Sequence, residues 1–164
     1  MAELIIRQVT EQDLQATNEI YNYYVINTTH TWRTEPEPID EHRLWFADHD
    51  VKHPFIVALW DGRVVGWGAL STFHSYASYR DTAEDSVWVH QDYHRRGIGS
   101  RLLIELLGSA AEFQYHTVVA RIDSQQEASI RLHEKYGFVS VGHLLQVAFK
   151  MGRWLDAIYM QRMV

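Results

Sequence analysis

The chain has 164 residues, of which 46% are hydrophobic and 22% are charged, the composition of an ordinary globular protein. Its 15 lysines and arginines against 21 aspartates and glutamates give a net charge of −6, whereas a nucleic-acid-binding protein normally has a basic excess. The chain has no cysteine, which excludes disulfides and a cysteine acyl-enzyme intermediate.

This length suits one domain, and no linker, repeat or low-complexity segment divides residues 1–164. The N-terminus lacks the apolar stretch of a signal peptide, and no apolar run approaches the ~20 residues that a membrane span needs. We therefore expect a single cytoplasmic domain whose partners include neither a nucleic acid nor a membrane.

Local patterns in the first 70 residues predict one strand, two helices and a hairpin. Thr10–Asp13 resembles a capping box, so a helix should start directly after it. Asp40 is a residue type that favours the N-cap of a helix. Asp61-Gly62 between two apolar runs predicts a tight hairpin turn. The expected elements are a strand at 4–9, helices at 14–24 and 40–48, a loop at 26–38, and strands at 55–60 and 63–70.

The rest of the chain alternates strands with helices and ends on two strands. The expected elements are an aromatic-rich loop at 72–80, strands at 84–89 and 118–122, helices at 98–113 and 127–136, and strands at 139–147 and 154–161. Two helices thus follow the first strand, and a run of three strands precedes the next helix. This order predicts an α/β (α+β) domain of three layers with a mixed sheet, not a simple doubly wound sheet.

A glycine-rich segment, His94–Ser100, joins the central strand to the next helix. Glycines at such a junction let backbone N–H groups gather around an anion, and the helix N-terminus adds roughly half a positive charge there. Arg95 and Arg96 contribute further positive charge. The segment therefore suits a pyrophosphate.

Two common pyrophosphate-binding motifs fail on specific residues. A nucleotide-hydrolase loop needs Lys-Ser/Thr after its last glycine, whereas Ser100-Arg101 follows here. A dinucleotide fold needs Gly or Ala three residues after Gly99, whereas Leu102 occupies that position.

A second segment, Ala120–Phe138, predicts a strand, a loop and a helix that ends at Gly137 as a C-terminal cap. Together the two segments resemble the GNAT acetyltransferase superfamily. Its R/Q-x-x-G-x-G/A loop binds the pyrophosphate of acetyl-CoA, and here His94 replaces the usual first residue. His133–Phe138 resembles the end of the superfamily's cofactor-wall helix. The resemblance implies acetyl-CoA as co-substrate and a mostly antiparallel seven-stranded sheet with about four helices.

Further segments narrow the resemblance to the phosphinothricin and methionine sulfoximine acetyltransferases. They are Asn22–Tyr24, Trp32–Pro36, Tyr79–Val89 and Gly152–Asp156. The resemblance implies an N-acetyltransferase that modifies the amino group of a small amino-acid-like acceptor, such as phosphinothricin, methionine sulfoximine or methionine sulfone. It also implies a homodimer, which the aromatic-rich C-terminal strands favour. Alternatives are an acetyltransferase for another small amine or a protein N-terminus, and a CoA-binding sensor without turnover.

The resemblance carries the cofactor site over to three parts of this chain. The residues that it assigns to acetyl-CoA are Val87, Trp88 and Val89 on the central strand, Arg95, Arg96, Gly97, Ile98, Gly99 and Ser100 in the loop, and Gln126 and Ser129 in the second segment. Backbone groups of Val87 and Val89 pair with the pantetheine arm in this superfamily. Gln126 stands where asparagine is usual.

Two residues are candidates for the chemistry. The resemblance places Glu84 beside the acceptor amine as the base, and since a carboxylate with a pKa of ~4.3 is a weak base for an ammonium group, we expect a water relay. Alternation along the strand sends Asp85 to the opposite face, where we expect a structural role. His133 stands where relatives carry the tyrosine that protonates the CoA thiolate, and Tyr136 is the alternative acid.

The acceptor is expected to meet Trp32 and the aromatic-rich loop with His74, Tyr76, Tyr79 and Arg80. In phosphinothricin-type relatives arginines hold an anionic head group where His74 and Tyr76 stand here. A weakly charged pocket follows, and it predicts a preference for methionine sulfone or sulfoximine over phosphinothricin. Histidines at i, i+4 spacing fall outside any zinc-protease motif, so we expect no metal.

Overall fold

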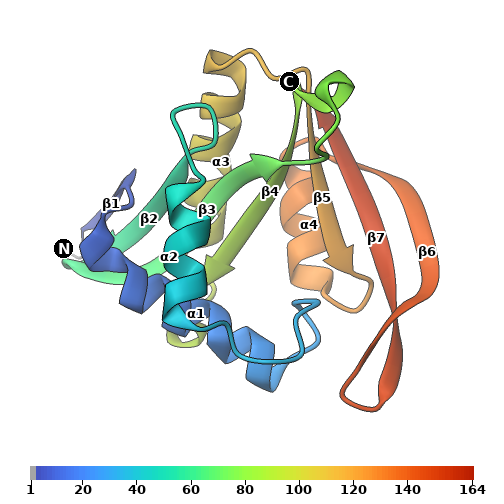
Figure 1. The fold of residues 1–164 in the computed structure, drawn as a ribbon, viewed down its shortest axis with the longest axis horizontal. Coiled ribbons are helices and arrows are strands. Elements are labelled where there is room, and N and C mark those ends of the chain that lie inside the picture. Colours follow the sequence, from blue (N-terminus) through green and yellow to red (C-terminus); the bar gives the residue numbers. More distant parts are fainter. Residues whose placement is uncertain (1–2) are drawn as a thin grey trace.

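A computed structural model describes residues 3–164 as one seven-stranded sheet with four α-helices (Figure 1). The strands are β1 Leu4–Gln8, β2 Phe55–Trp60, β3 Arg63–Thr72, β4 Thr82–Val89, β5 Thr117–Asp123, β6 Val139–Lys150 and β7 Arg153–Met163. The helices are α1 Leu14–Asn27, α2 Ile39–Ala47, α3 Ile98–Glu112 and α4 Glu127–Lys135. The expected element order is thereby confirmed.

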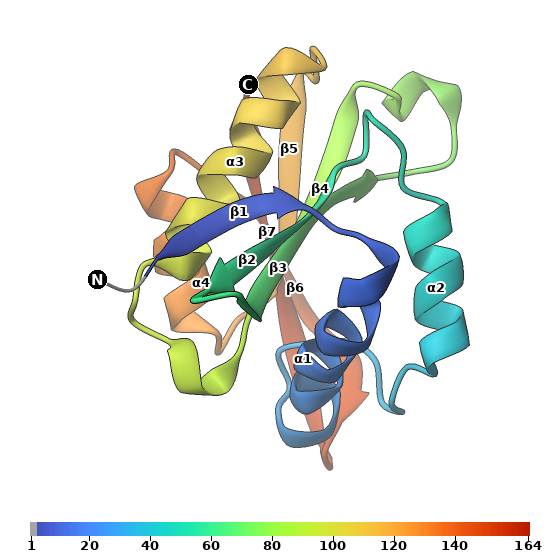
Figure 2. The ribbon, with the colours of Figure 1, turned by 90° about the vertical axis from the view of Figure 1, so that its left-hand side faces the viewer.

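The strand order in the sheet is β1-β2-β3-β4-β5-β7-β6, and the parallel pair is β4–β5. The other neighbouring pairs are antiparallel. Helices α1 and α2 cover one face of the sheet and α3 and α4 cover the other, which makes the three predicted layers (Figures 1 and 2). None of the helices among residues 3–164 is both long and apolar enough to cross a bilayer.

Side-chain alternation along β4 divides the two faces. Ala83 and Val87 belong to the apolar cluster under α3, whereas Trp88 packs into the cluster under α1 and α2. Because successive side chains of a strand point to opposite faces, Glu84 lies on the α1/α2 face and Asp85 on the α3/α4 face. The expectation that Glu84 and Asp85 lie on opposite faces of the sheet is thereby confirmed.

Most of the turn and cap predictions are confirmed. Asp61 and Gly62 have φ values of 49° and 80°, as a tight hairpin turn requires. Gly137 has a φ of 83° just beyond α4, and its N–H bonds to the carbonyl of Glu134. The prediction that Asp40 caps the second helix is wrong. The Pro38 carbonyl accepts the first helical bond from His42, so α2 already starts at Ile39.

Strands β4 and β5 part in the middle of the sheet. Their pairing runs from Thr82 to Glu84, while β5 continues to pair with β7 as far as Asp123. On the other side β4 stays paired with β3 up to Val89. Backbone groups beyond Glu84 that face β5 therefore become available to a ligand, as the predicted cofactor site requires.

Candidate active site

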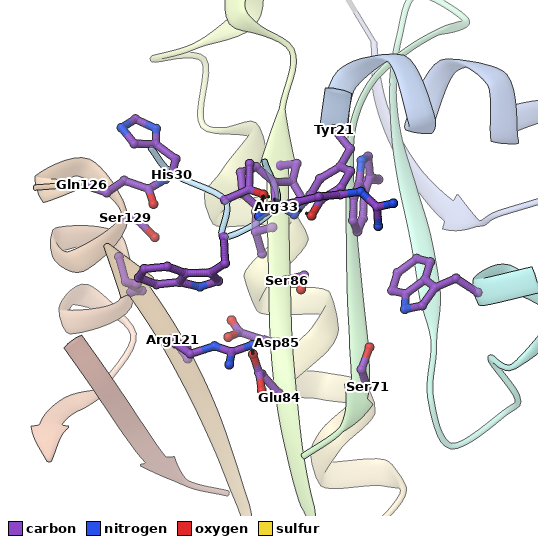
Figure 3. A pocket seen from close by; sticks show the side chains of 18 of the residues that line it. Tyr21, His30, Arg33, Ser71, Glu84, Asp85, Ser86, Arg121, Gln126 and Ser129 are labelled. Atoms are coloured by element: carbon purple, nitrogen blue, oxygen red, sulfur yellow. Dashed lines mark hydrogen bonds and ion pairs between the residues drawn. The ribbon is translucent and has the colours of Figure 1, made fainter. Parts of the chain in front are cut away.

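A cavity of about 440 Å³ lies where β4 and β5 part, and residues from both faces of the sheet line it (Figure 3). On the α3/α4 side the lining includes Asp85, Gln126, Ser129 and His133. On the α1/α2 side it includes Glu84, Ser86 and Trp88 of β4, Arg121 of β5, and aromatic residues from the helices. The cavity thus joins the predicted cofactor side to the predicted acceptor side.

Aromatic rings form the wall on the α1/α2 side. Tyr21 packs edge-on against Trp88 and Trp67, with ring centroids 5.4 and 6.1 Å apart, and Trp45 lies 5.6 Å from Trp67. Trp67 is buried, so its indole N–H needs a hydrogen-bond acceptor within the protein. It donates to the carbonyl of Thr17 at 3.1 Å. This rigid wall suits the apolar part of a small acceptor.

Glu84 is the carboxylate that β4 contributes to the acceptor side of the cavity, whereas Glu37, which also lines it, is bound to His42 at 2.7 Å. A guanidinium N–H of Arg121 on β5 donates to its Oε1 at 3.2 Å. Burial raises the pKa of Glu84 above its ordinary value, and the charge of Arg121 opposes that shift. A half-buried carboxylate with a raised pKa has the character of a general base.

His133 lies on the opposite side, buried against Asp85. Its Nε2 is 2.9 Å from Oδ2 of Asp85, and its Nδ1 is 2.7 Å from the carbonyl of Ser129. Both partners are hydrogen-bond acceptors, an arrangement that favours the doubly protonated imidazolium form of His133. Burial alone would lower the pKa of His133, but the charge and hydrogen bond of Asp85 raise it above its ordinary value. The ring holds a proton on the cofactor side of the cavity.

Tyr136, the alternative acid, lies away from this cavity. It lines a separate hollow with Gly137 and Arg162, and its carbonyl accepts a hydrogen bond from the Arg162 side chain. The geometry therefore brings His133, and not Tyr136, to the point where the two strands part.

The predicted pyrophosphate loop has an open backbone. Gly97 has a φ of 76°, α3 starts at Ile98, and nothing lies within 4 Å of where a Gly97 side chain would be. Gly99 packs more closely, since a Cβ there would lie 3.4 Å from Leu132 of α4. Ile98 sends its side chain into the core, and Ser100 is half-buried. The loop can therefore offer backbone N–H groups and the helix N-terminus to a phosphate.

The basic side chains of this loop are arranged differently from one another. Arg95 is exposed, whereas Arg96 lies over the rings of Trp60 and Tyr93, at 5.3 and 5.0 Å. The ring of His94 turns inward, with Nε2 2.6 Å from the hydroxyl of Tyr24. All three residues are exposed, and Arg96 is the arginine that packs on aromatic rings.

Backbone orientation along β4 separates Val87 from Val89. The carbonyl of Val89 already accepts hydrogen bonds from the Tyr24 hydroxyl and from Nε2 of His94. This carbonyl points away from β3. Because backbone groups of alternate residues in an antiparallel strand point to the same side, those of the other odd-numbered residues of β4 also point away from β3. The backbone groups of Val87 therefore face the gap between β4 and β5. The backbone groups of Trp88 face β3, and its ring belongs to the aromatic wall on the acceptor side.

The residues predicted to bind the acceptor fall into two groups. Trp32 lines the cavity, on a loop fixed by Thr29 bonded to buried Asp123 at 2.6 Å and by Lys150 bonded to the Thr31 carbonyl at 3.0 Å. The others lie on an exposed loop outside the lining: they are His74, Tyr76, Tyr79 and Arg80. The ring of His74 stacks on Tyr76 and lies tilted against Tyr79, each with centroids 4.9 Å apart, and Arg80 lies 3.5 Å from Asp81.

A family model described as "Acetyltransferase (GNAT) family" matches residues 17–138. The chain belongs to the GNAT acetyltransferase family. It is 36% identical over 157 residues to the L-amino acid N-acyltransferase MnaT of Escherichia coli K12, with 95% of this chain and 91% of the relative covered. It is 36% identical to an L-methionine sulfoximine/L-methionine sulfone acetyltransferase of Salmonella typhimurium, with 96% and 93% covered.

A solved structure of a GNAT acetyltransferase is also similar to this chain. A GNAT superfamily phosphinothricin acetyltransferase from Sinorhizobium meliloti, solved in complex with acetyl-CoA, matches with a TM-score of 0.95 at 33% identity. The match covers 98% of this chain and 88% of that one. The acetyltransferase fold predicted from the sequence is thereby confirmed, and acetyl-CoA is the co-substrate of this GNAT acetyltransferase.

Three parts of the site were not foreseen from the sequence. They are the contact of Arg121 with Glu84, the pairing of Asp85 with His133, and the aromatic wall of Tyr21, Trp45, Trp67 and Trp88. The alternation of β5 could have placed Arg121 on the acceptor face. Only the parallel pairing of β4 with β5 places it beside Glu84.

We expect Gly97→Asp to weaken acetyl-CoA binding at least about tenfold, or ~1.4 kcal/mol, because it sets a negative charge beside the pyrophosphate. Titration calorimetry measures the change. Gly152→Asp is the matched control, since Gly152 also has a positive φ, of 74°, and nothing within 4 Å of a side chain, but lies in the turn between β6 and β7. Equal affinities of the two variants would contradict a phosphate site at residues 97–100.

Proposed function

We propose that this GNAT acetyltransferase transfers the acetyl group of acetyl-CoA to the α-amino group of a small amino acid with an uncharged polar head, of the methionine sulfone or sulfoximine type. The observation that carries the proposal is the cavity where β4 and β5 part, with the Glu84 carboxylate on one side and the His133–Asp85 pair on the other. Relatives at 36% identity whose names state amino-acid acceptors support the substrate class.

Glu84 and His133 divide the proton transfers between the two faces. Glu84 takes a proton from the acceptor ammonium, directly or through one water. The free amine then attacks the thioester carbonyl, so that a C–N bond forms and the C–S bond breaks. The Nε2 proton of His133 leaves its hydrogen bond with Asp85, passes to the departing thiolate and gives CoA, and the second proton of the amine passes to solvent. No acyl-enzyme is needed, which agrees with the lack of cysteine.

The cofactor arm lies in this scheme between the pyrophosphate loop and the cavity. Backbone N–H groups of Gly97, Gly99 and Ser100 and the N-terminus of α3 hold the pyrophosphate, with Arg95 adding charge. Val87 offers its backbone to the pantetheine, and Gln126 and Ser129 line the far wall. These residues supply the charges that the reaction needs. We therefore propose that it requires no metal ion and continues in excess chelator.

We further propose that two copies of the chain associate in the cytoplasm, where acetyl-CoA is available. Edge strand β6 supports a dimer, because large apolar side chains are exposed along it: Val139, Val141, Leu144, Leu145, Val147 and Phe149. An exposed apolar edge strand of this kind is normally covered by a partner. Sedimentation as a 19.2 kDa monomer at micromolar concentration would contradict the dimer.

A thiol-release assay with different acceptors tests the proposed function. We expect kcat/KM for methionine sulfone to exceed that for phosphinothricin at least about tenfold, since each missing charge-assisted contact costs ~1.5–3 kcal/mol. Of the two arginines lining the cavity, Arg33 already binds Glu41 through two N–H groups, at 2.9 and 2.7 Å. If phosphinothricin is the better acceptor, the assigned head-group chemistry is wrong. If no amino acid releases CoA, the proposed function is wrong.

A further inference from the structure

The cavity contains several cationic or potentially cationic side chains, and most of them are already bound to protein. Arg33 holds Glu41 and donates its Nε–H to the carbonyl of Glu35 at 2.9 Å. His42 lies between Glu37 and Thr17, at 2.7 and 2.9 Å. His133 lies between Asp85 and the Ser129 carbonyl. Burial lowers the pKa of His30, the remaining histidine of the lining, and so favours its neutral form.

Arg121 differs from these residues. Its recorded polar contact is the N–H to Glu84 at 3.2 Å, and its side chain is 42% exposed. A guanidinium carries five N–H donors in one plane, arranged to bind a carboxylate through two parallel hydrogen bonds. Among the cavity-lining cations of residues 3–164, Arg121 thus keeps donors that can point to a ligand (Figure 3).

The position of Arg121 matches the geometry of one class of acceptor. Glu84 and Arg121 project from neighbouring strands on the same face of the sheet, one negative and one positive. An α-amino acid presents an ammonium and a carboxylate on a single carbon, with the opposite pair of charges. Its ammonium can replace Arg121 at Glu84 while its carboxylate replaces Glu84 at Arg121. Each of the two charges then keeps a partner before and after binding.

We propose that Arg121 binds the α-carboxylate of the acceptor and so selects α-amino acids over simple amines. The proposal rests on the proposed function, because it needs an acceptor amine at Glu84. It accounts for recognition of an amino acid in a chain whose exposed loop carries His74 and Tyr76, outside the cavity.

The competing role for Arg121 is to hold Glu84 in place. Two acceptors separate the roles: methionine sulfone and its decarboxylated analogue, 3-(methylsulfonyl)propylamine, which keeps the amine and the head group but lacks the carboxylate. Carboxylate binding makes Arg121→Gln selectively harmful to the amino acid. A positioning role makes the variant equally harmful to both acceptors. Comparing each acceptor between two enzymes cancels the difference in basicity of the two amines.

We expect Arg121→Gln to lower kcat/KM for methionine sulfone at least about tenfold more than that for the decarboxylated amine, mainly through KM, because any effect through Glu84 is common to both acceptors. Arg121→Lys, which keeps the charge but not the planar fork, should fall between Gln and wild type. Arg131→Gln is the matched control, because Arg131 is 74% exposed on α4 and pairs with Glu127 away from the cavity. It should leave both acceptors unchanged.

The remaining outcomes of this experiment each contradict one part of the proposal. An equal loss for the two acceptors, or a wild-type enzyme that does not prefer the amino acid, overturns carboxylate binding by Arg121 and leaves the acetyltransferase in place. A wild-type enzyme that releases CoA with neither acceptor overturns the proposed function itself. Unchanged acetyl-CoA affinity of each variant confirms that the chain is folded.

Discussion

Glu84→Gln is expected to lower kcat about 100-fold or more, since general acid–base catalysis typically contributes 10²–10⁴-fold and an amide cannot take the proton. The amide keeps the size of the side chain, and its carbonyl still accepts the hydrogen bond from Arg121. Affinity for acetyl-CoA should therefore stay near wild type. Glu105→Gln, an exposed carboxylate of α3 that lies 3.9 Å from Arg101, is the control and should behave as wild type.

The pH profile gives the same test without a variant. Burial raises the pKa of Glu84 above the ordinary value of a glutamate, ~4.3, and Glu84 acts only when ionised. The acid limb of kcat/KM should therefore lie above that value and disappear in Glu84→Gln. A variant with normal kcat across the neutral range would assign the base to another group.

Asp85→Asn is expected to destabilise the fold by ~3 kcal/mol, because removing one partner of a buried ion pair leaves the other uncompensated. Asp85 is 7% and His133 4% exposed, so solvent cannot replace the lost charge. Urea unfolding measures the difference. Asp50→Asn removes the partner of His53 from a surface pair in which Asp50 is 66% exposed, and should cost less than ~1 kcal/mol.

The stability difference should also depend on pH in a definite direction. Since the pKa of His133 is higher in the folded than in the unfolded chain, its contribution is complete below the unfolded value of ~6.5. It is lost as pH rises through the raised folded value. The gap between wild type and Asp85→Asn should therefore shrink in alkaline solution. A gap of constant size would show that His133 is neutral in the folded chain.

Local sequence signals were enough to predict most of the architecture. The Asp61-Gly62 turn, the Thr10–Asp13 box and Gly137 each depend on neighbours within a few residues, and the structure contains all three. Alternation along β4 was enough to separate Glu84 from Asp85. The prediction of Asp40 as N-cap failed because the carbonyl of Pro38 accepts the first hydrogen bond of the helix. Asp40, two positions later, therefore lies inside the helix although its residue type favours an N-cap.

The detailed chemistry of the site depends on contacts that no local pattern encodes. Arg121 and Glu84 are 37 residues apart, and His133 and Asp85 are 48 apart, so each pair exists only through the parallel pairing of β4 with β5 and the packing of α4. The resemblance to phosphinothricin-type relatives assigned the acceptor to the loop of His74 and Tyr76, where those relatives carry arginines. In the structure the aromatic lining of the cavity includes rings from α1, α2, β3 and β4, which come together only in the folded chain.

The most direct test of the account follows both products of one reaction. The protein is mixed with acetyl-CoA and methionine sulfone, and intact-mass spectrometry monitors the chain while product analysis locates the acetyl group. The account predicts one N-acetyl methionine sulfone for each CoA released, with no acetylated chain at any time. CoA release without N-acetyl product, or an acetylated chain that forms and decays at the rate of turnover, would contradict direct transfer in this cavity.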